Sequence, residues 1–109
     1  MKIAVASERN GVASHFGHCE GFVVFEIKDG EIINNKVVEN PGHEPGLLPR
    51  LLAREGVNVV IAGGMGMRAQ QLFTENNIRV VTGANGPIND VVKAFLEGNL
   101  IIGPNLCDH

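Results

Sequence analysis

The sequence is poor in aromatic residues and in cysteine. Its 109 residues include five Phe, two Cys, no Trp and no Tyr. So few aromatic rings leave little surface on which single-stranded nucleic acid can stack its bases. Two cysteines are too few for the disulfide framework that small secreted proteins use in place of a large core. The composition therefore predicts a cytoplasmic protein with reduced thiols, which are free to bind metal.

Basic charge and long apolar runs are also missing. Nine Lys and Arg against twelve Asp and Glu give a formal charge of −3, whereas nucleic-acid binding usually rests on a surplus of positive charge. No stretch approaches the roughly 20 apolar residues of a membrane span. Residues 1–6 lack the long apolar segment of a signal peptide. We expect neither nucleic acid nor a membrane as a partner.

The remaining composition is that of a packed globular protein, with 44% hydrophobic and 19% charged residues. A chain of this length has room for one domain. We expect a single domain over residues 1–102, followed by an irregular C-terminal tail over residues 103–109.

Three β-rich segments open the chain. Residues 3–6 form a short apolar run that suits a buried strand. Residues 22–27 and 32–38 flank Asp29-Gly30, and Asp-Gly between two such runs is a strong hairpin signal because Gly accepts the positive φ of a tight turn. An antiparallel hairpin therefore follows the first strand.

Helices and strands alternate in the rest of the chain. Apolar residues recur at helical spacing after Gly46, after Gly66 and between Ile88 and Leu96. Strand-like runs lie between these helices, over residues 57–62 and 78–81. The order β-β-β-α-β-α-β-α predicts a three-layer α/β fold, in which a five-stranded mixed sheet with an N-terminal antiparallel hairpin carries helices on its faces.

Three glycine-bearing loops, over residues 7–18, 63–66 and 82–87, are expected at the carboxyl ends of the parallel strands. Open α/β sheets bind their ligands at this edge. Two of the loops lead into helices, whose N-terminal N–H groups favour anions. We predict an anionic ligand there, although each glycine taken alone is equally explained by a tight turn.

Residues 64–69 fit the dinucleotide pattern G-x-G-x-x-A. The acidic residue expected about 20 positions later is absent, and too little chain remains for a second nucleotide-binding half. We therefore discount a dinucleotide site. Two interpretations apply to the residues Met65, Met67 and Arg68. They could line a soft, partly positive pocket, or the two methionines could fill gaps in the core.

The residues able to bind metal all fall in predicted loops or in the tail, outside every predicted core face. They are His15, His18, Cys19, His43, Cys107 and His109. Two cysteines cannot supply the four thiolates of an all-cysteine cluster. Ligation would need histidines, a second subunit or sulfur carried by the cluster itself. The metal ligands we predict are His15, His18, Cys19, Cys107 and His109.

Enzyme signatures are scarce. Asp occurs only at positions 29, 90 and 108, whereas a two-metal nuclease needs several converging carboxylates. The G-x-S-x-G elbow of serine hydrolases is absent. We expect a binding protein rather than an enzyme.

Several motifs in order resemble those of the dinitrogenase iron–molybdenum cofactor biosynthesis family. They are Ser14-His15-Phe16-Gly17 after the first strand, Glu39-Asn40-Pro41 after the hairpin, Gly63-Gly64-Met65-Gly66 at a helix start, Gly83-Ala84-Asn85-Gly86, and Gly98-Asn99-Leu100. Each motif is weak alone, but the ordered set spans nearly the whole chain.

The resemblance implies a ribonuclease-H-like topology, without nuclease activity. Members of the family include carriers of Fe–S or Mo–Fe–S cofactor precursors and a relative that binds a molybdenum–copper sulfide cluster. Storage or delivery of such an anionic cluster follows as the expected function, with cofactor-assembly proteins as partners. The resemblance places the pocket at Ser14, His15, Phe16, Gly17, Gly63, Gly64 and Gly66, to which the loop argument adds Met65, Gly83 and Gly86.

Two other functions remain open at this stage. One is a small enzyme that acts on a phosphorylated or thiol substrate at the same sheet edge. The other is a metal-free regulatory or interaction module that pairs through the strand over residues 32–38, which Lys36 alone protects. The sequence allows a monomer or a homodimer.

Overall fold

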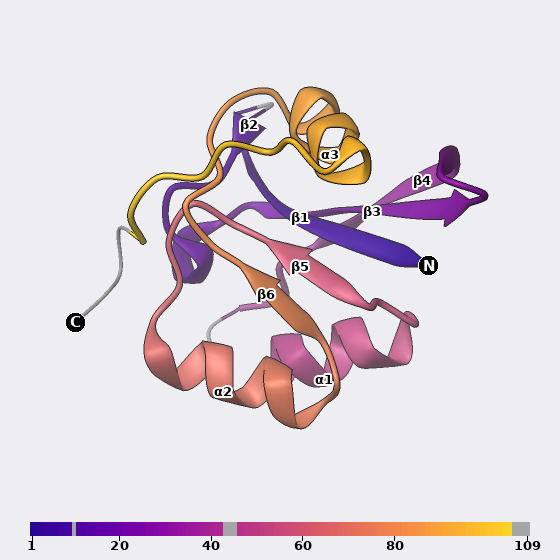
Figure 1. Cartoon of the computed structure of the whole chain (residues 1–109). Coiled ribbons are helices and arrows are strands. Elements are labelled where there is room, and N and C mark those ends of the chain that lie inside the picture. Colours follow the sequence, from indigo (N-terminus) through magenta and orange to yellow (C-terminus); the bar gives the residue numbers. More distant parts are fainter. Residues whose placement is uncertain (10, 43–45, 106–109) are drawn as a thin grey trace.

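The computed structural model describes residues 1–9, 11–42 and 46–105 (Figure 1). The chain order of its elements is β1 (Lys2–Glu8), β2 (Gly11–Val12), the 3-10 helix η1 (Phe16–His18), β3 (Gly21–Lys28), β4 (Glu31–Glu39), α1 (Leu47–Arg54), β5 (Val59–Ile61), α2 (Met67–Glu75), β6 (Arg79–Val81) and α3 (Ile88–Glu97). Among these residues, no helix has the length and apolar character that crossing a membrane requires.

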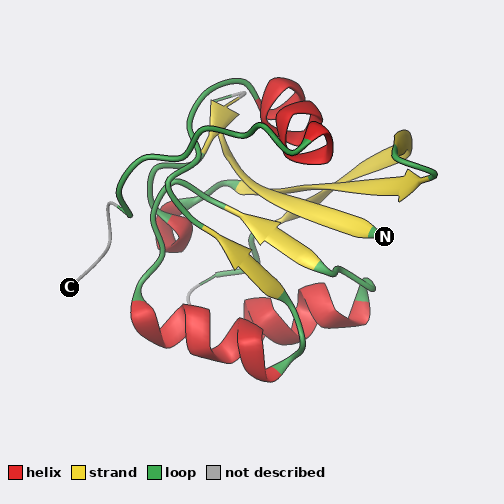
Figure 2. Cartoon of the chain, in the orientation of Figure 1, coloured by secondary structure: helices red, strands yellow, loops and turns green. Residues whose placement is uncertain are grey.

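The strands form one mixed sheet in the order β4-β3-β1-β5-β6, with β2 paired to β1 outside this path. Strands β1, β5 and β6 run parallel to one another, whereas β3 is antiparallel to both β1 and β4. Figure 2 shows α1 and α2 on one face of the sheet and α3 on the other. The predicted mixed sheet with helices on both faces is confirmed.

Central strand β1 shows why the fold has three layers. Its alternate side chains point to opposite faces of the sheet. Ala4 and Ala6 belong to the core under α1 and α2, while Ile3 and Val5 belong to the core under α3. All four are fully buried. The middle of the strand, residues 3–6, is therefore apolar at every position rather than alternating, as is usual for strands covered on both faces.

The predicted hairpin is confirmed. Asp29 and Gly30 connect β3 to β4 with φ values of 53° and 78°. Two positive φ values in a two-residue loop define the turn whose twist matches that of the strands. The pairing slips once: Glu26 lies opposite Asn34 but Ile27 lies opposite Ile32, which leaves a bulge in β4.

The prediction of five strands was one short, because it omitted β2. This strand has two residues, too few to show the alternation by which strands are recognised. The strand predicted over residues 57–62 is also shorter, since β5 covers Val59–Ile61. Val57 N–H instead donates a hydrogen bond of 3.1 Å to the Leu52 carbonyl of α1. It thereby ends the helix rather than starting the strand.

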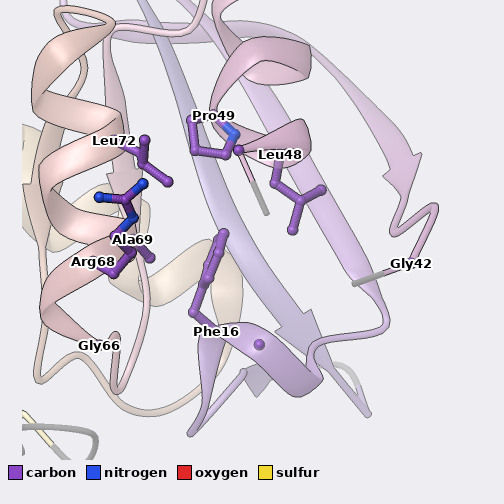
Figure 3. A pocket seen from close by; sticks show the side chains of 10 residues that line it. Phe16, Gly42, Leu48, Pro49, Gly66, Arg68, Ala69 and Leu72 are labelled. Atoms are coloured by element: carbon purple, nitrogen blue, oxygen red, sulfur yellow. The ribbon is translucent and has the colours of Figure 1, made fainter. Parts of the chain in front are cut away.

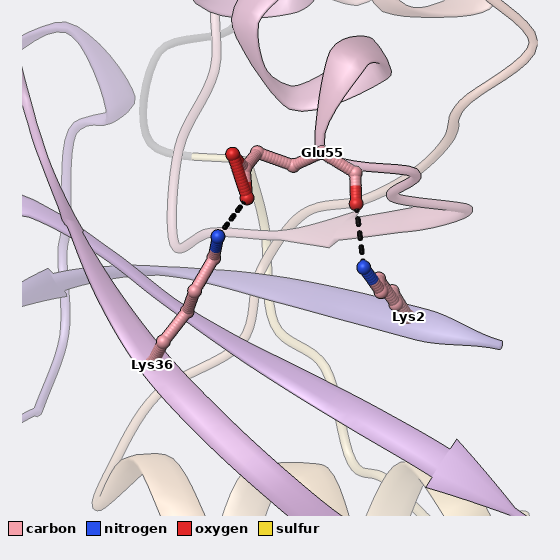
Figure 4. A network of polar contacts seen from close by, with 3 residues as sticks. All are labelled: Lys2, Lys36 and Glu55. Atoms are coloured by element: carbon pink, nitrogen blue, oxygen red, sulfur yellow. Dashed lines mark hydrogen bonds and ion pairs between the residues drawn. The ribbon is translucent and has the colours of Figure 1, made fainter.

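Glu55, directly after α1, connects that helix to two strands (Figure 4). Lys2 Nζ of β1 donates to the Glu55 carbonyl oxygen at 2.9 Å. Lys36 Nζ of β4 forms an ion pair with the Glu55 carboxylate. These contacts hold the C-terminal end of α1 against the sheet, while its N-terminal end faces the site described next.

Candidate functional site

The three glycine-bearing loops meet at the carboxyl ends of the parallel strands, as predicted. Gly63 N–H donates to the Ala13 carbonyl at 2.9 Å, and Gly83 N–H donates to the Gly63 carbonyl at 2.8 Å. Phe16 N–H donates to the Gly64 carbonyl, also at 2.8 Å. These backbone bonds join the loops after β1, β5 and β6 into one surface.

The C-terminal segment lies across this surface, which the sequence did not predict. Gly103 N–H donates to the Gly83 carbonyl at 2.8 Å. Asn105 Oδ1 accepts from Met65 N–H at 2.9 Å, and Asn105 Nδ2 donates to the Met65 carbonyl at 2.9 Å. Residues 103–105, expected to be part of an irregular tail, thus help to build the edge of the sheet where the site lies.

The loops border two separate cavities. The first, which we name the strand-end cavity, has a volume of about 380 Å³. Among the predicted site residues it includes Ser14, Gly63 and Gly83. Its lining residues are Val12, Ser14, Gly63, Gly83, Ala84, Asn85, Ile101, Gly103 and Pro104.

The second cavity, of about 330 Å³, lies between the N-terminal ends of α1 and α2, and we name it the helix-end cavity. Figure 3 shows the ring of Phe16 pointing between the two helices. Among the predicted site residues it includes Phe16, Gly17 and Gly66. Its lining residues are Phe16, Gly17, Gly42, Gly46, Leu48, Pro49, Gly66, Arg68, Ala69 and Leu72.

The walls of the helix-end cavity are mainly apolar. Phe16 is buried and packs its ring edge-on against Phe73 at 5.3 Å between centroids. Leu48 and Pro49 of α1 line the space on one side, and Leu72 of α2 lines it on the other (Figure 3). An occupant would therefore contact carbon on several sides and meet polar groups at one end.

Those polar groups favour negative charge. The residues that precede α1 and α2 are Gly46 and Gly66, which have no side-chain oxygen to cap the first-turn N–H groups. Neither helix carries an acidic residue in its first turn, whereas α3 carries Asp90 there. Arg68, in the first turn of α2, adds a guanidinium to the lining. Two positive helix ends and an arginine make this end of the cavity electropositive.

The two histidines of the first loop lie beside this cavity in the chain. His15 precedes η1 and His18 ends it, so they flank the cavity-lining Phe16 and Gly17. Both histidines are exposed, with their ring centroids 6.2 Å apart. Their assignment as metal ligands stays a prediction.

The expectation that every cysteine lies outside the core was wrong for Cys19. Its side chain is 5% exposed and belongs to the core beneath α1 and α2. Asn40 Nδ2 lies 3.7 Å from Cys19 Sγ and 2.9 Å from the Cys19 carbonyl oxygen. Burial raises the pKa of the Cys19 thiol from 9.0 to about 11, against a lowering by the Asn40 hydrogen bond. The neutral thiol is therefore the form present near pH 7.

The remaining residues that could bind metal lie outside the part of the chain that the structure describes. Cys107 and His109 lie outside the described residues, as does His43. Among the residues that are described, no three His, Cys, Asp or Glu side chains come together as a metal site would require.

The methionines take different positions. Met65 is fully buried in the core, as one of its two interpretations required, whereas Met67 is 61% exposed. Two other predicted residues, Gly64 and Gly86, hold the loop after β1 by accepting hydrogen bonds at their backbone carbonyls. Phe16 N–H donates to the Gly64 carbonyl, and Val12 N–H donates to the Gly86 carbonyl at 3.0 Å. Arg68, which the sequence places with the two methionines as a possible pocket lining, does line the helix-end cavity.

Known proteins similar to this chain match it over nearly their full length. The crystal structure of PH0822 has 39% identity, covers 94% of each chain and gives a TM-score of 0.88. An uncharacterised protein of Methanocaldococcus jannaschii is 37% identical over 105 residues, which are 92% of this chain and 89% of that protein. The apo form of the orange protein from Desulfovibrio gigas has 26% identity, covers 95% of this chain and 93% of its own, and gives a TM-score of 0.78.

The family match agrees with the motifs of the loops. The protein family described as Dinitrogenase iron-molybdenum cofactor matches residues 1–98. This range contains η1, all the strands described above and the glycine-bearing loops that join at the site. The chain belongs to the dinitrogenase iron–molybdenum cofactor family.

Proposed function

We propose that this protein binds an anionic metal–sulfur cluster, or a precursor of one, in the helix-end cavity and carries it as cargo. The observation that supports this most is that Arg68, in the first turn of α2, and two helix N-termini without side-chain caps border the same apolar cavity. The reaction expected of such a site is reversible binding rather than turnover. Storage or delivery during cofactor assembly follows, with the assembly proteins as partners in the cytoplasm.

The chemistry of the cavity suits a sulfide-rich cluster. Such a cluster is negatively charged and polarisable, so it gains both from cationic groups and from close contact with carbon. The first-turn N–H groups of α2 and the Arg68 guanidinium supply the positive charge. The ring of Phe16 and the side chains of Leu48 and Leu72 supply apolar contact and exclude water, which strengthens the attraction between the charges.

The buried thiol favours one mode of ligation over the others. The raised pKa of Cys19 keeps its sulfur protonated, and thiolate is the form that binds metal. The side chain also lies in the core rather than among the cavity-lining residues. A cluster that brings its own sulfide ligands needs no protein thiolate, and His15 and His18 can add imidazole at its exposed edge.

The comparisons support this proposal in general terms. The family is described by the iron–molybdenum cofactor, and the orange protein structure is that of an apo form, which implies a ligand for that protein. The ribonuclease-H-like topology remains a prediction from the family resemblance. A carrier, rather than a thiol enzyme, is also supported by the protonated state of Cys19, because a neutral thiol is a poor nucleophile.

Anaerobic titration with tetrathiomolybdate, followed by the visible charge-transfer spectrum, tests the proposal. The wild-type protein is expected to bind near stoichiometrically. Arg68→Glu removes a charge-assisted contact worth about 1.5–3 kcal/mol, so its dissociation constant should rise by about 10- to 100-fold. Arg54→Glu makes the same charge change at an exposed position of α1 outside the cavity and serves as the control.

Three outcomes contradict the proposal. Equal weakening in both arginine variants would mean that net charge, not the cavity, governs binding. Failure of the wild-type protein to bind thiomolybdate or to take up iron and sulfide would remove the carrier function. Turnover of a phosphorylated or thiol substrate by metal-free protein would favour the enzyme alternative.

A further inference from the structure

Strand β4 is an unusually open sheet edge. It has nine residues, and no strand among the described residues pairs with its outer side, whereas the opposite edge strand, β6, has three residues (Figure 1). Ile33 and Val37 on β4 are 54% and 70% exposed. A long edge with exposed apolar residues is a template for pairing with another strand.

The sequence of β4 identifies that strand as another β4. Glu-Ile-Ile-Asn-Asn-Lys-Val-Val-Glu reads nearly the same from either end, with Asn35 at its centre. Two copies paired antiparallel about Asn35 place residues of matching type opposite one another. Asn34 faces Lys36 of the second copy, and Ile33, at the bulge of β4, meets Val37, while beyond the bulge the regular pairing ends.

The backbone of β4 is oriented for this pairing. Asn35 N–H donates to its neighbour's side-chain oxygen, Asn34 Oδ1, at 2.9 Å in an exposed position. This N–H therefore points away from β3 and toward the open edge. In an antiparallel pair centred on Asn35, the two Asn35 residues exchange N–H···O=C bonds across the axis, and the side chain of Asn34 is displaced.

Charge does not oppose the contact at its centre. Lys36, the residue that could protect the edge, forms an ion pair with Glu55 on the α1 side of the sheet. Its ammonium is thus balanced within its own chain and held out of the plane of the strands. Glu31 and Glu39 fall at the two ends of β4, outside the regular pairs about Asn35, and both are exposed to water.

We propose that this protein forms a homodimer in which β4 pairs antiparallel with β4 of a second copy about Asn35. A two-fold axis perpendicular to the sheet preserves its faces. The two sheets then become one, with α1 and α2 of both copies on one face and both α3 helices on the other. The helix-end cavities of both copies then lie on the same face of the joined sheet but at its two opposite ends, because the strands of the second copy run in the reverse direction. The dimer itself does not depend on the cargo.

Sedimentation velocity of the full chain over a series of concentrations tests this interface. Wild-type protein is expected to sediment as a dimer. Asn35→Pro removes the outward N–H without removing a bond to β3, because Pro is tolerated in an edge strand where its nitrogen faces solvent. Val37→Lys places a charge in the contact. Both variants should sediment as monomers while keeping the wild-type circular dichroism spectrum.

Ile101→Lys is the matched control, because Ile101 is 89% exposed and lies in the C-terminal segment rather than on β4. It should remain a dimer. Hydrogen exchange gives an independent measure: the amides of Asn35 and Val37 should become protected as concentration rises. A wild-type monomer at millimolar concentration, or a dimer that persists in Val37→Lys, would overturn the proposal. Because Val37→Lys needs no proline, the test stands even if Asn35→Pro does not fold.

Discussion

The side-chain amide of Asn105 pairs with both backbone groups of Met65, 40 positions earlier. Each of the two hydrogen bonds measures 2.9 Å. The Met65 carbonyl also accepts from Gln70 Nε2 at 2.8 Å, at the start of α2. One asparagine therefore holds the C-terminal segment to the loop that leads into the helix-end cavity, in the manner of a neighbouring strand.

Asn105→Ala should lower the free energy of unfolding by about 1–3 kcal/mol, because the N–H of the fully buried Met65 loses its acceptor. Asn85→Ala, an exposed asparagine in the strand-end cavity, should change it by less than about 0.5 kcal/mol. Urea denaturation of the two variants provides the measurement. Equal stabilities of the two variants would show that the hydrogen bonds of the Asn105 side chain do not stabilise the fold.

Gly83→Ala should destabilise the protein more than Gly98→Ala, although the backbone φ is nearly the same at both positions, +82° and +78°. A methyl group at Gly83 would lie 2.0 Å from the Gly103 carbonyl oxygen, whereas nothing lies within 4 Å of one at Gly98. The left-handed backbone costs an alanine about 1–2 kcal/mol at either site.

The difference between the two variants therefore measures the contact with Gly103. We expect Gly83→Ala to exceed Gly98→Ala by at least about 1 kcal/mol in urea denaturation, since overpacking costs about 1–3 kcal/mol. The amide of Gly103 should also exchange faster with solvent in Gly83→Ala. Equal costs for the two alanines would mean that the C-terminal segment moves aside freely.

The elements that the sequence predicted well are those defined by neighbouring residues. Asp29-Gly30 indicates its turn because both central φ values must be positive, and the apolar spacing of α3 defines one buried face. These signals need no knowledge of distant contacts. The meeting of the loops after β1, β5 and β6 followed as well, because parallel strands place their carboxyl ends at one edge.

The features that the sequence did not predict depend on distant contacts. Cys19 lies in a segment without regular spacing, so nothing in its neighbours indicates that it is buried beneath α1 and α2. The partner of Asn105 is 40 residues away. The division of the predicted site residues between two cavities likewise depends on how the loops cross, with Ser14 in one and Phe16 in the other.

Lys36→Met should change stability by less than about 1 kcal/mol, because an ion pair with a side chain that is 57% exposed contributes little. Lys2→Met should cost more, about 0.5–1.5 kcal/mol, since Lys2 Nζ donates to a carbonyl at the C-terminal end of α1. Urea denaturation at low and at high salt separates the two. The Lys36 contribution should disappear in high salt, and a larger effect of Lys36→Met than of Lys2→Met would contradict this assignment.

Cys19 should react slowly with a disulfide reagent in the folded protein. In a Cys107→Ser background, where Cys19 is the remaining thiol, the raised pKa of about 11 reduces the thiolate fraction at pH 8. A rise of two pKa units corresponds to about 100-fold less thiolate, and burial slows access further. The rate in the native protein should therefore be at least about 100-fold below the rate in urea. Similar rates in both conditions would contradict the burial of this side chain.

The same raised pKa links stability to pH. Because the folded state binds the Cys19 proton more tightly than the unfolded state, this contribution is fully present below pH 9 and is lost as pH rises through about 11. Lysines also titrate in this range, so the informative quantity is the difference between Cys107→Ser and Cys107→Ser/Cys19→Ala. The first should lose stability relative to the second between pH 9 and pH 11. Parallel stability curves would place the Cys19 thiol in contact with water, where it would again be available to bind a metal.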